Sequence, residues 1–122
     1  MLTPLELDIM KAVWRRPPIT VRDVQEAIRP GRHLAYTTVM TIMDRLYHKG
    51  SLKRTLQARS YLYEPAIDFI KVRDEAVERL VESFFGSKDK LKEFLETGSG
   101  DVLPRIVHEP ASAASALDET LL

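Results

Sequence analysis

The sequence of 122 residues contains no cysteine and no long apolar run. The lack of cysteine excludes disulfides and thiolate metal sites, and it suits a reducing compartment. No stretch approaches the roughly 20 apolar residues that a membrane-spanning helix needs. The N-terminal segment MLTPLELDIM carries acids and lacks the basic start and long apolar stretch of a secretory signal. We therefore expect a cytoplasmic protein without membrane insertion, built as one domain or one small domain with an appendage.

Signatures of catalysis and of metal or cofactor binding are missing as well. The histidines His33, His48 and His108 are scattered, without the spacing of metal ligands. No glycine loop of the phosphate-binding kind occurs, and the serine, histidine and aspartate residues form no nucleophile motif. The sequence therefore predicts a protein that is not an enzyme and that uses no cofactor or metal.

Charge is balanced overall but unevenly distributed along the chain. Residues 1–64 hold 11 lysines and arginines against 6 acids, whereas residues 65–122 hold 7 against 12. From Arg29 to Arg59 the only acid is Asp44. A basic segment of this kind favours a polyanionic partner, because neutralising phosphates releases counterions. The alternative is a solvated surface whose charge has no functional meaning.

Three short helices are expected in the basic half. Thr3 and Glu6 form a capping-box pattern that starts the first helix, and Pro17-Pro18 ends it. The second helix starts at Thr20, and the third begins between residues 35 and 37 and stops at Gly50. Helical spacing gives each helix an apolar face, formed by Leu5, Ile9, Ala12 and Val13, by Val21, Val24, Ala27 and Ile28, and by Val39, Ile42, Met43 and Leu46.

A basic β-hairpin is predicted after the third helix. Its strands are residues 51–56 and 60–64, with residues 57–59 as the tip. The tip lacks the glycine of a tight turn, so its geometry stays open. Tyr61 and Tyr63 alternate along the second strand, which favours partial burial over stacking on single-stranded bases. Three helices followed by a basic hairpin predict a winged helix-turn-helix domain over residues 1–65.

The acidic half predicts a helical appendage. A long helix over residues 67–85 and a shorter one before Gly98 form the region 66–97, and residues 98–122 are expected to be a mobile or weakly helical tail. These helices are too small for an independent core. We therefore expect them to dimerise with a second chain, the alternative being packing onto residues 1–64. The predicted dimer contacts are Ile70, Val77, Leu80, Val81, Phe84, Leu91, Phe94 and Leu95.

The outer face of the third helix is the candidate DNA-reading surface. With the apolar residues turned inward, the outward residues are Thr37, Thr38, Thr41 and Arg45. Threonine can bond a phosphate or a base edge and can touch a thymine methyl group, and arginine can bond guanine or clamp a phosphate. On an isolated helix these would be ordinary surface residues. Their position after two helices and before a basic hairpin favours contact with DNA.

Further side chains are predicted to contact the DNA from the wing or at the DNA backbone: Arg32, Tyr36, His48, Lys53, Arg54 and Arg59. The hairpin cations are expected to meet phosphates or the minor groove, although charged residues also protect edge strands from aggregation. His48 equally complements the dipole at the end of its helix. For Tyr36, contact with the backbone and packing beneath the turn stay open.

Three segments carry a family resemblance: LTPLELDIMKAVW, TVRDVQEAI, and AYTTVMTIMDRLYHKGSLKR followed by YLYEP. Together they resemble the penicillinase and methicillin-resistance repressor family, which also includes copper-responsive repressors. The resemblance covers about residues 2–95. It implies a homodimeric winged-helix repressor that binds a DNA dyad through its N-terminal domain and dimerises through C-terminal helices. By this resemblance the recognition helix is about Tyr36 to Lys49 and the wing is Ser51 to Glu64.

Departures from the family pattern concern how repression is relieved. Copper-responsive members sense metal through C-terminal cysteines, which this chain lacks. The β-lactam branch is relieved by cleavage at an Asn-Phe bond, and the resemblance implies a membrane sensor-protease as a partner. The segment KLKEFLE matches that region with Glu93-Phe94 at the bond, so that Phe94 agrees and Glu93 does not. We prefer the interpretation of Phe94 as an aromatic residue of the dimer core.

The sequence therefore predicts a homodimeric, sequence-specific repressor that blocks transcription by occupying a dyad operator in double-stranded DNA. The alternative is a winged helix that serves as a protein–protein interaction module without specific DNA binding. The basic segment from Arg29 to Arg59 argues against this alternative.

Overall fold

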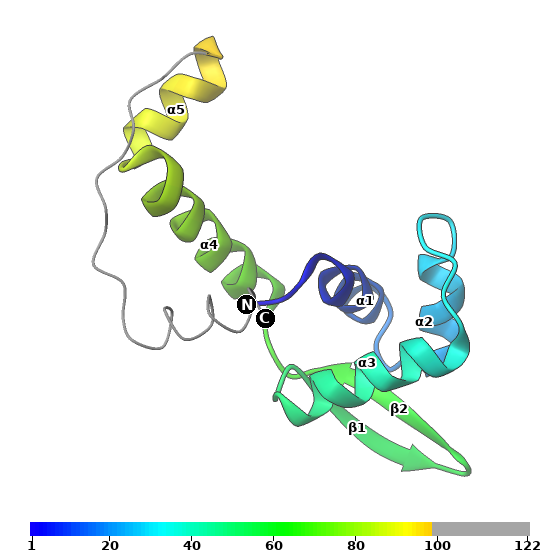
Figure 1. Ribbon diagram of the computed structural model, residues 1–122. Helices are drawn as coiled ribbons and strands as arrows, with labels where there is room; N and C mark the ends of the chain where they lie inside the picture. The colour runs from blue at the N-terminus through cyan, green and yellow to red at the C-terminus, as the bar shows by residue number, and fades with distance from the viewer. Residues whose placement is uncertain (99–122) are drawn as a thin grey trace, which may run out of the picture. The chain divides into compact units, whose positions relative to one another are not determined.

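The computed structural model describes residues 1–98, and its elements follow the order α1, α2, α3, β1, β2, α4, η1 and α5 (Figure 1). The chain divides into two compact units, the first running from Met1 to Val72 and the second beginning at Arg73. The predicted class, mostly helical with one small hairpin, is confirmed. The elements of the first unit are α1 (Pro4–Arg15), α2 (Val21–Ile28), α3 (Tyr36–His48), β1 (Leu52–Gln57) and β2 (Ser60–Pro65).

The predicted capping box starts α1. Thr3 Oγ1 accepts a hydrogen bond from the Glu6 amide at 3.1 Å, and Glu6 Oε1 accepts one from the Thr3 amide at 2.9 Å. Two N–H groups that the helix leaves unpaired are thereby satisfied. Glu6 is buried, and its other carboxylate oxygen accepts a bond from Lys49 Nζ at 2.9 Å. One carboxylate therefore caps α1 and joins it to the C-terminal end of α3.

Replacing Glu6 with glutamine is expected to lower the free energy of unfolding by about 1 kcal/mol at neutral pH. Glutamine keeps an acceptor for the cap but loses the charge opposite Lys49. Burial raises the pKa of Glu6, but hydrogen bonds from the Thr3 backbone and from Lys49 outweigh burial and hold this pKa below its usual value. A lowered pKa stabilises the fold above the pH at which the unfolded carboxyl titrates, and that contribution is lost as the pH falls through the folded-state pKa. Denaturant unfolding of both proteins at neutral pH and at about pH 3 should show the difference shrinking in acid; a difference independent of pH would contradict the role of the charge.

The core of the first unit lies between the three helices and the base of the hairpin. Its fully buried side chains are Ile9, Met10, Val13, Val24, Val39, Met43, Leu46 and Tyr63. The inward face predicted for α3 is confirmed, because all four of its predicted members are buried. On α2 the prediction was wrong for Ala27, which is exposed. Ala27 lies roughly a quarter of a turn away from the buried row of Val21, Val24 and Ile28.

The turn of the hairpin is tighter than the sequence indicated. Gln57 pairs with Ser60, so the turn consists of Ala58 and Arg59 rather than of three residues. Ala58 has a positive φ of 56°, a conformation in which two-residue hairpin turns usually have asparagine, aspartate or glycine. The absence of glycine left the geometry of the turn open, and the structure places an alanine in the left-handed conformation there.

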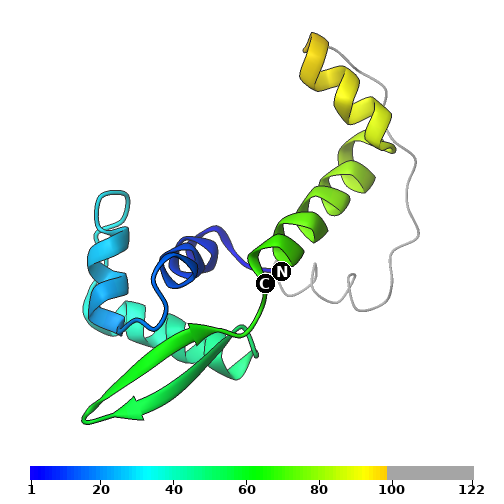
Figure 2. The same ribbon diagram turned by 180° about the vertical axis from the view of Figure 1, so that it is seen from behind.

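A backbone bridge fixes the base of the hairpin to the helices. Ile19, between α1 and α2, donates to the Tyr63 carbonyl at 3.0 Å and accepts from the Tyr63 amide at 2.8 Å. α3 also packs against β1. Beyond this base, residues 55–61 are exposed, and Figure 2 shows the hairpin extending away from the helices to its turn. The wing is thus anchored at one end only.

The first unit extends beyond residue 65, where we expected it to end. Trp14 Nε1 donates to the Ile67 carbonyl at 3.0 Å, and the Trp14 ring meets Phe69 edge-on with centroids 5.2 Å apart. The Ile67 side chain also packs against the core. These contacts join the segment after the hairpin to α1. The next helix, α4 (Phe69–Leu80), accordingly begins at Phe69 rather than at residue 67.

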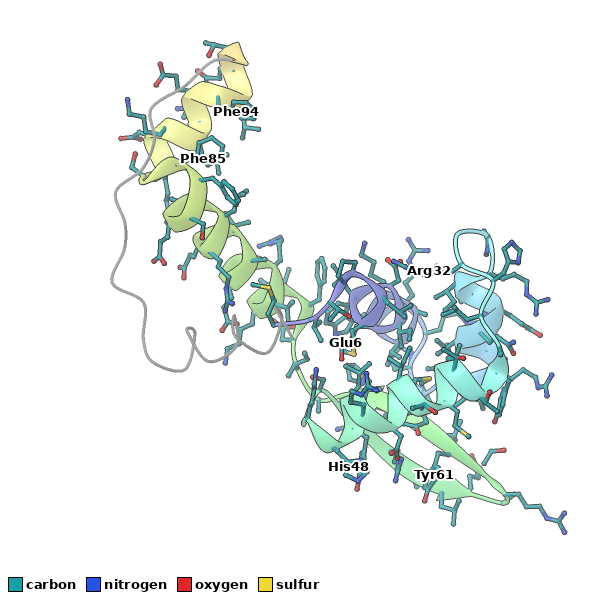
Figure 3. All side chains as sticks on the ribbon, viewed as in Figure 1. Glu6, Arg32, His48, Tyr61, Phe85 and Phe94 are labelled. Atoms are coloured by element: carbon teal, nitrogen blue, oxygen red, sulfur yellow. The ribbon has the colours of Figure 1, made fainter. Side chains whose placement is uncertain are left out.

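The region after the hairpin contains a helix, a glycine break and a shorter helix, as predicted, and the first four residues of the helix α4 belong to the first unit. α4 continues into a π-helical turn, η1 (Val81–Phe85), which ends at Gly86 with a φ of 83°. Ser87 Oγ accepts from the Lys90 amide at 3.2 Å and starts α5 (Lys88–Thr97). The rings of Phe85 and Phe94 lie 5.4 Å apart and hold η1 against α5 (Figure 3). Of the helices in residues 1–98, none has the length and apolar character needed to cross a membrane.

Candidate nucleic-acid interface

The outward face of α3 is open to solvent along its length. Thr37, Thr38, Thr41 and Arg45 are all exposed, as their spacing predicted. Thr41 Oγ1 donates to the Thr37 carbonyl at 2.9 Å, which leaves the oxygen of Thr41 able to accept a further bond. The Arg45 side chain forms no hydrogen bond or ion pair with any residue of the described chain. α3 therefore presents an unpaired guanidinium group on the same face as a row of hydroxyl groups.

Three further exposed residues of α3 were not predicted as site residues: Met40, Asp44 and Tyr47. Met40 is 41% exposed, which is a high value for an apolar side chain on a helix whose other face forms the core. The signal was present in the sequence, because these residues follow Tyr36 and Thr37 at steps of three or four. They add an apolar group, an acid and an aromatic ring to the outward face.

Two of the predicted wing cations are available for a partner. The Lys53 side chain is 66% exposed, and its Nζ lies 3.6 Å from Glu64 Oε2 on the paired strand. An exposed ion pair of this kind contributes little to stability, so a phosphate can replace the carboxylate. Arg59 is exposed in the turn and has no partner among residues 1–98.

Arg54 is placed differently from its neighbours on β1. Its side chain is 15% exposed, and its Nη1 donates to Asp44 Oδ1 at 2.8 Å and to Tyr63 Oη at 3.3 Å. The guanidinium carbon lies 3.9 Å from the ring centroid of Tyr47 and 4.1 Å from that of Tyr61. The expectation that Arg54 reaches the DNA backbone does not fit this placement, because its charge is engaged within the protein.

The pairing of Arg54 with Asp44 fixes the charge of both groups. The hydrogen bond from Arg54 holds the pKa of Asp44 below its usual value, although partial burial acts in the opposite direction. The same bond raises the pKa of Arg54 above that of a free guanidinium. The two groups therefore remain a charged pair throughout the pH range in which proteins bind DNA.

The remaining predicted contacts have partners of their own. Arg32 Nε donates to Asp8 Oδ2 at 2.7 Å, and this bond lowers the pKa of Asp8. The Arg22 guanidinium lies 5.7 Å from the ring of Tyr36, which stays exposed. His48 Nδ1 lies 2.8 Å from the Asp44 carbonyl oxygen. Figure 3 shows Arg32 beside α1 and α2, well apart from His48 at the end of α3, so Arg32 does not join the α3 surface.

Most apolar side chains predicted for a dimer contact are open in the single chain. The exposed members are Ile70, Val77, Leu80, Phe84, Phe94 and Leu95, and Leu91 is half-buried. Val81 differs, because it is only 6% exposed and already packs within its own chain. Val81 is therefore removed from the surface that a second chain could contact.

The predicted cleavage position, Glu93-Phe94, lies within α5. Phe94 packs on Phe85, and the Glu93 carboxylate lies 3.9 Å from Lys90 Nζ. These contacts give Phe94 a packing role in its own chain. Cleavage at this bond stays a prediction.

Within residues 1–98, histidine and acidic side chains do not gather in groups of three or more that could ligate a metal. Every buried side-chain nitrogen or oxygen in that range has a hydrogen-bond partner. What the surface offers a partner is positive charge, hydroxyl groups and apolar contact.

Comparison with known proteins gives consistent similarities. The profile of a family described as penicillinase repressor matches residues 2–104. The transcriptional regulator BlaI of Mycobacterium tuberculosis is 41% identical over 81 residues, which are 66% of this chain and 56% of that protein. The penicillinase repressor of Bacillus licheniformis is 27% identical over 78 residues, covering 62% of this chain and 61% of that protein. The chain thus spans little more than half the length of these relatives.

A solved structure resembles part of this chain. The solution structure of the DNA binding domain of the repressor BlaI superposes with a TM-score of 0.52 at 28% sequence identity. The superposition covers 57% of this chain and 84% of that domain. The winged-helix fold predicted from the sequence is confirmed.

Proposed function

This chain belongs to the penicillinase repressor family, and from that premise we propose that it is a DNA-binding transcriptional repressor that acts as a dimer on a dyad operator. The family consists of transcriptional repressors, so the expectation that the chain is not an enzyme is confirmed. Repression then needs no chemical step, because a protein that occupies the operator excludes the transcription machinery from the same DNA.

The observation that carries this proposal is the outward face of α3. On this face the unpaired Arg45 side chain lies in a row of threonines, and the wing exposes Lys53 and Arg59. These groups can bond the base edges and phosphates of a DNA duplex. The major groove accommodates one helix, whose side chains can bond base edges, while wing cations meet phosphates of the backbone. We assign base contacts to Thr37, Thr38, Thr41 and Arg45, with Met40 as an apolar contact to thymine.

Dimerisation is proposed through the apolar face of α4 and η1. Ile70, Val77, Leu80 and Phe84 recur at steps of seven, three and four along these helices, which places them on one side. Each is exposed in the single chain, and an apolar row of this length is usually covered in the functional state. Two chains related by a twofold axis would present two copies of α3 about one helical turn of DNA apart.

Replacing Lys53 with alanine is expected to weaken binding to all duplexes by a similar factor. A phosphate contact carries no base information, so the ratio of specific to non-specific affinity should stay constant. The slope of log affinity against log salt should flatten by about one, because one fewer counterion is released. Fluorescence anisotropy across a salt series measures both quantities. A change in sequence preference would show that Lys53 reads bases or positions a residue that does.

The proposal is tested by a mobility shift with the DNA immediately upstream of this protein's own coding sequence. We expect retardation that survives an excess of unrelated duplex and weakens steeply with salt. If unrelated duplex competes as well as the upstream DNA does, the protein binds DNA without sequence specificity. No retardation at moderate salt would favour the alternative, a winged helix that binds a protein partner.

Release from the operator is a separate question from binding. A membrane sensor-protease is the partner we propose from the family resemblance, with Glu93-Phe94 as the position to test. Because this bond lies inside α5, a protease would need that helix to open locally before cleavage. Mass spectrometry of the chain after induction of a neighbouring sensor gene would locate any cut.

A further inference from the structure

Arg54 is the centre of a cluster that joins the wing to α3. We define the Arg54 cluster as Arg54 on β1, Asp44 and Tyr47 on α3, and Tyr61 and Tyr63 on β2. Arg54 lies directly opposite Tyr63 in the strand pair, and successive residues of a strand alternate between faces, so Tyr61 shares that face. The ring centroids of Tyr61 and Tyr63 are 6.2 Å apart.

The cluster supplies side-chain contacts between the hairpin and α3. A two-stranded hairpin is only marginally stable by itself, and residues 55–61 are exposed. Below them the hairpin is held by the Ile19–Tyr63 bridge and by packing at its base. At the level of this bridge, Arg54 donates to Asp44 on α3 at 2.8 Å. Its guanidinium carbon also lies over the rings of Tyr47 on α3 and Tyr61 on β2.

The geometry of arginine suits this role. Its planar guanidinium can donate in its plane and stack on aromatic rings with its faces at the same time, which a lysine ammonium cannot do. Here Nη1 donates to Asp44 and Tyr63, and the guanidinium carbon lies over the rings of Tyr47 and Tyr61. One side chain therefore restrains the angle between a helix and a strand pair.

We propose that Arg54 is a positioning residue for DNA recognition, which sets the wing beside α3 so that both reach the duplex together. The inference rests on the proposed DNA binding. It assigns Asp44, an acid on the face that meets a polyanion, the task of holding Arg54. It also separates Arg54 from Lys53 and Arg59, which would contact phosphates themselves.

Replacing Asp44 with alanine distinguishes positioning from electrostatics by the sign of its effect. Removing an acid from a DNA-facing helix should tighten binding if charge alone matters. If Asp44 holds Arg54, binding to the upstream duplex should instead weaken about tenfold. Alanine suits a helix, so α3 should stay folded, which circular dichroism checks. Asp23→Ala on α2 is the matched control, and it should leave affinity unchanged or slightly higher. Unchanged or tighter binding by Asp44→Ala would overturn the proposal.

A double-mutant cycle tests whether Asp44 and Arg54 act as one unit. Arg54→Ala should weaken binding about as much as Asp44→Ala, and the double variant should be no weaker than the weaker single variant. Arg54→Lys keeps the charge but loses the fork and the stacking, so it should behave like Arg54→Ala. Losses that multiply in the double variant, or full affinity in Arg54→Lys, would show that Arg54 acts through its charge on DNA.

A measurement without DNA keeps the inference separate from the proposed function. Amide hydrogen exchange of hairpin residues 55–61 should be roughly fivefold faster in Asp44→Ala than in the unmodified chain, while α1 and α2 stay unchanged. Equal exchange rates in the hairpin would overturn the role of the cluster even if the protein binds DNA. Failure of the unmodified chain to select its upstream duplex would overturn the proposed function, whatever the exchange rates show.

Discussion

Replacing Arg45 with alanine is expected to reduce the affinity for the operator by about 1–3 kcal/mol, or roughly 5- to 150-fold, while binding to unrelated duplex changes far less. The Arg45 side chain is exposed on α3 and has no partner within residues 1–98, so its guanidinium group is free to form two hydrogen bonds to guanine. Loss of such a bond also relaxes the preference for one base pair, because the favoured base no longer gains anything over its competitors.

Competition binding with single-base variants of the operator measures this effect at fixed salt. Arg15→Ala is the matched control, since it removes the same charge from the end of α1. We expect Arg15→Ala to change specific and non-specific binding by similar small factors. If Arg45→Ala leaves affinity and base preference unchanged, Arg45 does not contact bases, and the threonines of α3 alone would have to read the sequence.

Replacing Phe84 with aspartate is expected to produce a folded monomer that binds the operator roughly a hundredfold more weakly. Phe84 is 67% exposed in the single chain, so a charge at this position causes no burial cost in the monomer. In a dimer the same charge would be enclosed in an apolar contact, where an unpaired carboxylate is strongly unfavourable. Without the dimer, each α3 binds its half-site alone and the gain from effective concentration is lost.

Sedimentation velocity and anisotropy on the same samples test this prediction. Ser83→Asp is the matched control, because it introduces the same charge at the neighbouring position, away from the row of apolar residues on η1. We expect the control to remain dimeric and to keep its affinity. If Phe84→Asp remains a dimer, the dimer contact does not involve Phe84. If it is a monomer with full affinity, DNA binding does not depend on dimerisation.

The fold was predictable where local rules determine it. Capping at Thr3 and Thr20, the glycine ends at Gly50 and Gly86, and the inward row of α3 depend on residues within one or two turns of each other. For the same reason the exposed threonines and Arg45 could be placed without coordinates. The two-residue turn escaped prediction because alanine there takes a conformation that sequence statistics assign to other residues.

The part of the site that escaped prediction depends on contacts between distant segments. The sequence predicts that Arg54 is a cation on the wing. Its partners become evident only in the fold, where α3 and β2 bring Asp44 and Tyr61 next to it. The same applies to Val81, whose burial within its own chain the helical pattern does not reveal. The extension of the first unit to Val72 likewise follows from Trp14, which lies 53 residues before its acceptor Ile67.

The central claim, that two copies of α3 read a dyad in successive major grooves, is tested most directly by a hydroxyl-radical footprint of the full chain on its upstream DNA. We predict two protected patches on each strand, related by a twofold axis and separated by about one helical turn, or roughly 34–36 Å. The wing should add protection at the flanking backbone. A single patch without symmetry, or uniform weak protection along the whole duplex, would contradict the claim.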